Sequence, residues 1–249
     1  MKFALASVLL LVAYASAFGV LEQIEEVKPV VGGVSGTGTA TRYWDCCKPT
    51  CAWLKNTDPR QTPVKACKAD GVTAMDVLNN SGCGDGQSFI CTDQHGYAKN
   101  ETLAYGFAAA KFIHAGDRNM CCVCVMFTFH TELPSPLNGK KMLAQVTNTG
   151  NDDPDAKHNE FDIAMPGSGV GLWDQGCVNQ WHNDPSVWGD RNGGVHTLED
   201  CYKLPEPLQE GCAFRFEWMA GYNNPDVTFE EVTCPKELTD KSGCFPVEY

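Results

Sequence analysis

Two acidic residues lie in sequence surroundings that suit acid–base chemistry. Asp45 stands directly after two aromatic residues and before two adjacent cysteines, in the segment Thr41-Arg42-Tyr43-Trp44-Asp45-Cys46-Cys47. Asp162 belongs to a strand-like segment, Asn159–Ile163, which runs into the glycine-rich stretch Met165–Gly171. Aromatic residues near these segments in the sequence include Trp53, Trp173 and Trp181. Two carboxyl groups with aromatic rings are what glycoside hydrolysis requires: one acid protonates the leaving oxygen, and the other activates water or attacks.

Each feature also has a simpler interpretation. An aspartate beside Arg42 is commonly half of an ion pair, and a glycine-rich stretch after a strand is commonly a turn. The glycines match neither the P-loop nor the G-x-G-x-x-G dinucleotide pattern, which argues against phosphate binding. No G-x-S-x-G motif is present, so the sequence offers no serine nucleophile of that type.

Charge and cysteine content restrict the compartment and the partners. With 19 basic and 31 acidic residues the formal charge is −12, which argues against a nucleic-acid partner. Fourteen cysteines in 249 residues indicate an oxidising compartment and up to seven disulfides, whose connectivity the spacing does not give. Zinc binding is the alternative for the Cys121–Cys124 cluster, but paired C-x2-C motifs are missing. Oxidised cysteines also exclude a thiol nucleophile.

The N-terminus resembles a secretory leader. Lys2 precedes an apolar run over Phe3–Val12, and Ala15-Ser16-Ala17 is typical of a cleavage site. We therefore predict a signal peptide over residues 1–17, a linker or pro-segment over 18–36, a single catalytic domain over 37–249, and secretion with no membrane partner after cleavage. Two N-glycosylation sequons follow, at Asn79-Asn80-Ser81 and Asn100-Glu101-Thr102.

Alternating apolar residues predict a β-rich core with extended loops. Strands are expected at Cys121–Thr131, Lys140–Thr149, Asn159–Met165, Ala213–Met219 and Asp226–Cys234. Short helices are expected at Thr102–Phe112 and Val195–Leu204. A closed barrel suits this pattern because it leaves no exposed strand edges.

Several collinear motifs give the chain a resemblance to a known family. The run from Thr41 to Trp53, TRYWDCCKPTCAW, resembles the signature of glycoside hydrolase family 45 endoglucanases. The likeness continues through the segments Leu103–Ala109, Cys121–Cys124, Gly139–Met142, Asn159–Gly171 and Gly211–Met219. It covers roughly residues 37–245 in collinear order.

The resemblance implies an inverting endo-β-1,4-glucanase (a cellulase) built on a mainly β fold. The expected fold is a six-stranded double-psi β-barrel with long disulfide-pinned loops and a few short helices. It implies that Asp45 is the general base and Asp162 the general acid, with the two carboxyl groups roughly 6.5–9.5 Å apart to admit a water molecule. The substrate would be a β-glucan polysaccharide, no metal or cofactor would be needed, and the enzyme would act as a monomer.

Further roles follow from the same resemblance. Tyr43 and Trp53 match positions that contact glucosyl rings, and Lys48 matches a basic residue near the catalytic base. An assisting acid on a loop corresponds best to Asp152, with Asp155 as the alternative and Asp153 a third candidate. Glu160 departs from the family pattern, which commonly has histidine two residues before the acid.

Other functions compete with hydrolysis of cellulose. An expansin-like or barwin-like protein would share the barrel and bind wall polysaccharide without cutting it, but the intact motif around Asp45 favours an enzyme. An enzyme of this family directed to xyloglucan or lichenan is a third candidate. A purely structural cysteine-rich protein would leave the acidic and aromatic clusters unexplained.

Overall fold

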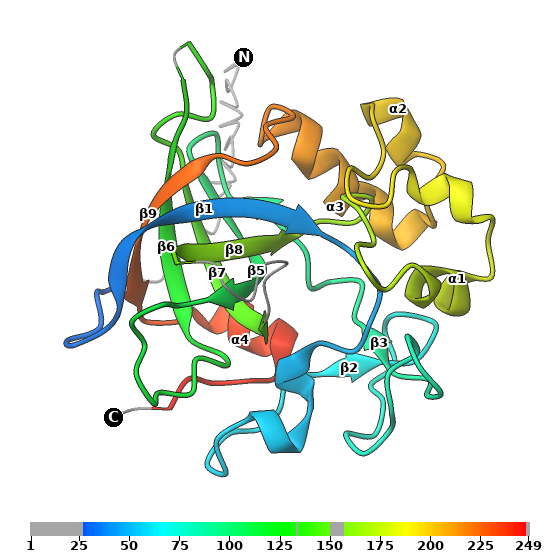
Figure 1. Ribbon diagram of the computed structural model, residues 1–249, viewed down its shortest axis with the longest axis horizontal. Helices are drawn as coiled ribbons and strands as arrows, with labels where there is room; N and C mark the ends of the chain where they lie inside the picture. The colour runs from blue at the N-terminus through cyan, green and yellow to red at the C-terminus, as the bar shows by residue number, and fades with distance from the viewer. Residues whose placement is uncertain (1–26, 133, 150–156, 248–249) are drawn as a thin grey trace, which may run out of the picture.

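The secondary structure is described for residues 27–132, 134–149 and 157–247 of a computed structural model (Figure 1). Its strands are β1 (Ser35–Tyr43), β2 (Ala66–Cys67), β3 (Phe89–Ile90), β4 (Tyr97–Ala98), β5 (Leu103–Lys111), β6 (Cys124–His130), β7 (Lys141–Thr149), β8 (Asn159–Ala164) and β9 (Asp226–Val232). Its α-helices are α1 (Gln175–Trp181), α2 (Leu198–Cys201), α3 (Glu206–Glu217) and α4 (Lys236–Ser242). Short 3-10 helices are η1 (Thr50–Ala52), η2 (Leu54–Asn56) and η3 (Pro185–Trp188).

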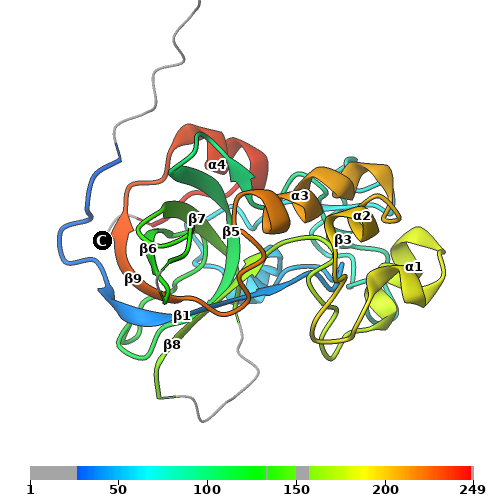
Figure 2. The same cartoon turned by 90° about the horizontal axis from the view of Figure 1, so that it is seen from above.

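Six strands close into a barrel in the order β5-β7-β6-β9-β1-β8, and β8 pairs back onto β5. The pairs β1–β8 and β5–β7 are parallel, and the other four pairs of the barrel are antiparallel. Figure 2 shows the ring of strands, with α1, α2 and α3 gathered on one side of it. The closed barrel confirms the expected mainly β fold and leaves the short strand β4 as an addition to β5.

Alternating side chains fill the barrel. Phe127 and Phe129 of β6 are fully buried, and the ring of Phe161 on β8 lies 4.7 Å from that of Phe127 and 4.8 Å from that of Phe229, between ring centroids. Aromatic pairs at these distances add to the free energy of burial. The strands predicted at β6, β7, β8 and β9 are confirmed. Deeply buried and less buried residues largely alternate in β6, β8 and β9, whereas β7 is buried on both faces from Met142 to Thr147.

The helix predicted at Thr102–Phe112 was wrong, because this segment forms β5. Its run of alanines favours a helix locally, but pairing with β7 on one side and β8 on the other overrides that preference. Gly106 is needed in the strand, since a Cβ there would lie 2.5 Å from Cε of Met142 and 2.8 Å from Cα of Gly96.

The strand predicted at Ala213–Met219 was also wrong, because most of it lies in α3. Phe214 and Trp218 are four residues apart and so share one side of the helix, where their rings stack with centroids 5.4 Å apart. The alternating pattern misled because Phe216, between them, is also partly buried, against a second cluster. The helix predicted at Val195–Leu204 is partly correct: α2 begins at Leu198 and ends at Cys201.

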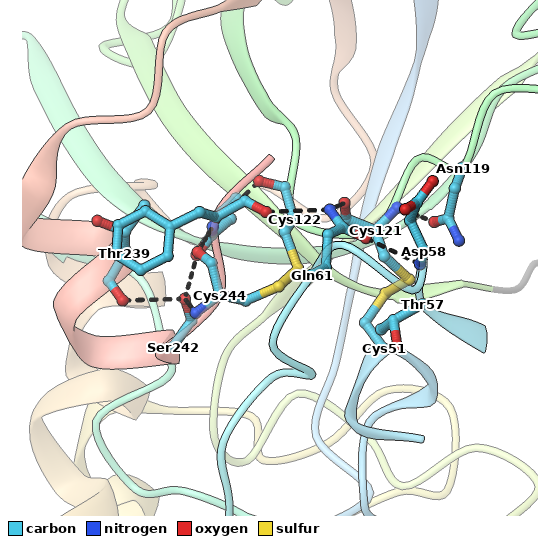
Figure 3. Close-up of a disulfide and its surroundings, with 12 residues drawn as sticks. Cys51, Thr57, Asp58, Gln61, Asn119, Cys121, Cys122, Thr239, Ser242 and Cys244 are labelled. Carbon is cyan, nitrogen blue, oxygen red and sulfur yellow. Dashed lines mark hydrogen bonds between the residues drawn. A yellow bond between two sulfur atoms is a disulfide. The ribbon is translucent and has the colours of Figure 1, made fainter. Parts of the chain in front are cut away.

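All fourteen cysteines form disulfides, which confirms that reading over zinc binding. The pairs are Cys46–Cys177, Cys47–Cys83, Cys51–Cys121, Cys67–Cys91, Cys122–Cys244, Cys124–Cys234 and Cys201–Cys212. In Figure 3 the adjacent Cys121 and Cys122 reach in different directions, to Cys51 and to Cys244. The two adjacent cysteines, which precede β6, thus tie both η1 and the C-terminal part of the chain to the barrel.

Part of the predicted linker packs on the barrel. The main-chain N–H of Val30 donates to the carbonyl of Glu231 at 2.9 Å, and that of Glu231 donates to Val34 at 2.8 Å. The predicted signal peptide, residues 1–17, lies outside the described residues. Within the residues that are described, the helices are too short and too polar to cross a bilayer.

Candidate active site

Both predicted catalytic carboxylates line one cleft, at the ends of β1 and β8. These strands are parallel, and their arrows point toward the side of the barrel that carries α1 and α2 (Figure 1). Asp162 pairs in register with Thr41 of β1 and with Ala109 of β5, and Ala109 in turn pairs with Asn148 of β7. The four residues form a row across neighbouring strands, and all four line the cleft.

Asp162 owes its direction to the strand. Phe161 and Ile163, its neighbours on β8, are fully buried, so the alternation of a strand turns the carboxyl group away from the core. The hydroxyl of Thr41 donates to Oδ1 of Asp162. The acid candidate is therefore placed by pairing with β1 and β5 and oriented by a hydroxyl of β1.

Asp45 stands just beyond the end of β1. Its Oδ1 accepts a hydrogen bond from the main-chain N–H of Cys47 at 2.9 Å, which closes a turn through Cys46, a residue with φ of 61°. Burial raises the pKa of Asp45 to about 6, although the bond from Cys47 acts in the opposite direction. A carboxylate with a raised pKa is a stronger base once it has ionised.

Two disulfides and a glycine hold that turn. Cys46 bonds to Cys177 of α1, and Cys47 bonds to Cys83 of the loop between β2 and β3. Gly176 packs against the turn so closely that a Cβ there would lie 2.2 Å from the carbonyl oxygen of Asp45 and from Sγ of Cys83. Only glycine allows α1 to approach the backbone of Asp45 in this way.

An irregularity in β7 brings Asn148 to the cleft. The register of the β5–β7 pair shifts between Ala108 and Ala109, so Thr147 is an extra residue and Asn148 lies opposite Ala109. The amide nitrogen of Asn148 donates to the Tyr43 hydroxyl at 3.2 Å, and its oxygen accepts from the N–H of Thr50 at 2.9 Å. Burial, together with the charges of Asp45 and Asp162, raises the pKa of Tyr43, so its hydroxyl stays protonated beside the two carboxyl groups.

The glycine-rich stretch forms one wall of the cleft. Gly167, Gly169 and Gly171 have φ of 71°, 108° and 55°, a region that residues with a side chain rarely adopt. The N–H of Trp44 donates to the carbonyl of Gly169 at 2.8 Å, which joins this wall to the chain just before Asp45. The wall ends in Trp173, whose side chain lines the cleft and is 58% exposed.

Arg42 does not form the ion pair with Asp45 that its position in the sequence suggests. Its guanidinium donates to the main-chain carbonyls of Asn223 at 3.2 Å and Gly193 at 3.3 Å. Burial lowers the pKa of Arg42. The simpler interpretation of Asp45 as half of an ion pair is therefore wrong.

Lys48 and Trp53 lie outside the residues that line the cleft. Lys48 is buried, and its Nζ donates to the carbonyls of Val77 at 2.7 Å and Asn79 at 2.9 Å. The same ammonium lies 4.1 Å from the ring centroid of Trp53, whose side chain is half-buried. Such a contact fixes one face of the ring by cation–π attraction.

Several predicted positions near the acid lie elsewhere or outside the described residues. Asp152, Asp153 and Asp155 are outside them. Glu160 lies on the same side of β8 as Asp162, and its Oε1 is 3.1 Å from Nε2 of His158. Within the described ranges, no group of three or more histidine, cysteine, aspartate or glutamate side chains is arranged to hold a metal ion.

Several residues that line the cleft were not predicted from the sequence, among them Asn148, Leu172, Arg191 and Asn192. Nothing in the sequence marks Asn148, because its direction depends on the irregularity at Thr147. Arg191 approaches through the fold, with its guanidinium donating to the carbonyl of Gly171 at 2.6 Å. Leu172 has a signal in the sequence, since it directly follows the glycine-rich stretch.

Comparisons with known proteins agree with this geometry. The sequence model of glycosyl hydrolase family 45 matches residues 37–245. The chain is 46% identical over 220 residues to an endoglucanase of Phaedon cochleariae, covering 88% of each protein, and 42% identical over 213 residues to an endoglucanase of Cryptopygus antarcticus, covering 86% of this chain and 91% of that protein. The crystal structure of the cellulase from the Antarctic springtail Cryptopygus antarcticus superposes with a TM-score of 0.78 at 41% identity, covering 86% of this chain and 99% of that one.

Proposed function

The chain belongs to glycosyl hydrolase family 45, and on that premise we propose that it cuts internal bonds of β-1,4-glucan by inversion, with Asp45 as general base and Asp162 as general acid. The observation that carries this proposal is the single cleft that both carboxyl groups line, with aromatic residues beside them. An expansin-like protein that binds without cutting is not favoured, since the similar proteins are endoglucanases.

The two carboxyl groups differ in the proton state that the reaction needs. Asp162 begins protonated and transfers its proton to the leaving glycosidic oxygen. Asp45 begins ionised and removes a proton from a water molecule, which attacks the anomeric carbon from the opposite side of the sugar ring. The attack inverts the anomeric configuration, and both carboxyl groups then exchange protons with solvent to restore the starting state.

The raised pKa of Asp45 sets the acid side of the pH dependence. Below about pH 6 this carboxyl is protonated and cannot act as a base. We therefore expect kcat/KM to rise as the pH increases through about 6 and to fall again where the acid loses its proton. In kcat/KM, this rise with pH reports the pKa of the base in the free enzyme.

Sugar rings would lie along the aromatic residues of the cleft. Tyr43 and Trp173 line it, and Trp53 with Lys48 beneath it would extend the binding surface. A substrate-binding role for Lys48 would be exerted through Trp53, because its own ammonium donates to main-chain carbonyls. Asp152, or Asp155 in its place, remains our candidate for the assisting acid.

The biological setting follows from the leader and the cysteines. We infer that the protein is secreted, since seven disulfides are typical of an oxidising compartment and residues 1–17 have the pattern of a signal peptide. It would act as a monomer on an extended polysaccharide, with no nucleic-acid partner.

The test compares viscosity loss with reducing-end release on carboxymethylcellulose. Wild type is expected to lower the viscosity before many new ends appear, and Asp45→Asn and Asp162→Asn to do neither. Asp226→Asn on β9, outside the cleft, is the matched control and should behave as wild type. NMR of the first products tests inversion: β-anomers at the new ends would contradict it.

Substrate preference needs the same assay on other glucans. Activity on lichenan or xyloglucan that exceeds activity on cellulose would assign the cleft to that polysaccharide. Binding to cellulose with no cleavage of any β-glucan would overturn the proposal of an enzyme.

A further inference from the structure

The two N-glycosylation sequons stand in different structural settings. Asn100-Glu101-Thr102 occupies the turn between β4 and β5, and all three of its residues are exposed. Asn79-Asn80-Ser81 lies in the loop between β2 and β3, where Asn79 and Ser81 are only half-exposed. A glycan needs an amide nitrogen that reaches solvent in the folded protein.

The turn fixes Asn100 and leaves its amide nitrogen available. Oδ1 of Asn100 accepts from the N–H of Thr102 at 2.9 Å, from the Thr102 hydroxyl at 3.2 Å and from the N–H of Leu103 at 2.8 Å. Its main-chain N–H donates to Leu103 at 3.0 Å, and its carbonyl accepts from the indole N–H of Trp218 at 2.9 Å. Nδ2 has no hydrogen bond to the part of the chain that is described, so substitution on it breaks none of these bonds.

Asn79 instead lies in a loop that holds Lys48 and Cys83, close to the turn of the general base, Asp45. Its Oδ1 accepts from the N–H of Gln87 at 2.9 Å, and its carbonyl accepts from Nζ of Lys48 at 2.9 Å. The hydroxyl of Ser81, the third residue of the sequon, accepts from the N–H of Lys48 at 3.1 Å and of Cys83 at 3.2 Å. A glycan here would press on a loop whose contacts reach the turn of Asp45.

A hollow adjoins Asn100, separate from the catalytic cleft. It shares none of its lining residues with that cleft. Its apolar lining comes from Ala98, Ala213, Phe214 and Trp218. Its polar lining includes Glu101, Lys140 and the α3 residues Glu210 and Glu217. A sugar has an apolar face and a rim of hydroxyls, and an N-acetyl group adds a methyl and an amide, so this mixture suits the first sugar of a glycan on Asn100.

We propose that Asn100, and not Asn79, carries an N-linked glycan, and that its first N-acetylglucosamine occupies the hollow beside α3. In the transfer, Nδ2 of Asn100 bonds to C1 of an oligosaccharide held on a lipid diphosphate. The bond from C1 to the diphosphate oxygen breaks, and the lipid diphosphate leaves with that electron pair and takes up the proton that the amide loses. This inference goes beyond the proposed hydrolysis and rests on the proposed secretion.

The test is secretion of the full chain from a eukaryotic host, followed by peptide mass spectrometry after release with a peptide N-glycosidase, which converts a glycosylated asparagine to aspartate. Conversion is expected at Asn100 and not at Asn79. Thr102→Ala should abolish the modification while leaving Asn100 in place, and Thr102→Ser should keep it. Asn79→Gln is the matched control and should leave the glycan intact.

Each other outcome overturns a defined part. No conversion at Asn100 in secreted protein, or conversion at Asn79 alone, overturns the assignment. A second version with the host's own leader in place of residues 1–17 separates the causes: if only that version is secreted, the proposed leader fails, and conversion at Asn100 still supports the site. Glucanase activity of Asn100→Gln should equal that of wild type, so failure here is distinct from failure of the proposed hydrolysis.

Thermal unfolding tests the hollow. An endoglycosidase that leaves one N-acetylglucosamine should leave Tm unchanged, and full removal should lower it. Full removal also converts Asn100 to aspartate, so the change in Tm that Asn100→Asp causes in unglycosylated protein is measured separately and subtracted. If full removal and trimming give equal Tm values, the first sugar does not occupy the hollow.

Discussion

The two catalytic candidates face the same cleft but are held by different parts of the molecule. Asp162 lies inside the barrel sheet, with paired neighbours on β1 and on β5 and a hydroxyl donor from Thr41. Asp45 lies beyond the end of β1, in a turn that has one hydrogen bond to its carboxyl group and two disulfides at the residues that follow.

This difference shows two ways of positioning a carboxyl group. A strand with neighbours on both sides is fixed by main-chain hydrogen bonds that form with the fold itself. A turn outside the sheet has no such ladder, so covalent bonds and close packing must limit its conformations. Changes to the loops and disulfides should therefore affect Asp45 more than Asp162.

Removing either carboxyl group should give the largest effect. Asp45→Asn and Asp162→Asn are each expected to lower kcat about 10³-fold or more, because general acid–base catalysis typically contributes ~10²–10⁴-fold for each group. Initial rates on a soluble β-glucan measure this. A variant that keeps more than a tenth of the wild-type kcat would remove that residue from the mechanism.

The second-largest loss of activity is expected from adding a single methyl group at Gly176, which packs against the turn of Asp45. In Gly176→Ala the new Cβ would meet the carbonyl oxygen of Asp45 and Sγ of Cys83 at 2.2 Å, so α1 or the turn must move. A displacement of the base by about 1 Å can cost up to ~10²-fold in rate, and we expect kcat to fall about 10- to 100-fold. Gly84→Ala is the control, since its nearest contact would be 3.7 Å away, and it should keep full activity.

The contrast between strand and turn also explains what the sequence could predict. The alternation in β6, β8 and β9 is strong enough to predict each of them, because one face of each strand is more deeply buried than the other. The strand β7 was predicted as well, although both of its faces are buried. The alternation fails at β5 and α3, where contacts with other elements, and not the local pattern, decide the conformation.

The site divides in the same way. Asp45 and Asp162 could be proposed from motifs, because the residues around them are distinctive in sequence. The partners of the cysteines could not, since sequence spacing leaves the pairing open. The role of Asn148 depends on the extra residue Thr147 in β7, and the burial of Lys48 depends on carbonyls 29 and 31 residues away in sequence. Such contacts exist only once the chain has folded.

Removing one disulfide at the base should separate stability from activity. Two double variants are compared. The first, Cys47→Ala combined with Cys83→Ala, removes a bond that closes 36 residues; the second, Cys67→Ala combined with Cys91→Ala, removes a bond that closes 24. Loop entropy predicts a similar loss of about 3–4 kcal/mol in the free energy of unfolding for both pairs. Only the first pair adjoins Asp45, so only it should lose activity, by about tenfold at a temperature where both fold. Equal activities would mean that the turn keeps its shape without this bond.

The smallest expected effect, and the sharpest test of how the base is held, is a change in stability and not in turnover. Burial raises the pKa of Asp45 in the folded protein from 3.8 to about 6. The folded state therefore binds this proton more tightly than the unfolded state, so this group costs stability as the pH rises from about 4 to 6, and the full cost remains above 6. Asp45→Asn removes the charge while its side-chain oxygen can still accept from the N–H of Cys47.

At pH 7 the variant should thus be more stable than wild type by about 2–3 kcal/mol, and at pH 4 the two should be nearly equal. For a chain of this size such a gain raises Tm by roughly 4–10 °C, which calorimetry at the two pH values would measure. Asp226→Asn, an exposed residue of β9, should show no such gain. If Asp45→Asn were no more stable than wild type at pH 7, the base would not be held in a desolvated position. Asp45 would then differ from Asp162, the acid on β8, only in being held by disulfides.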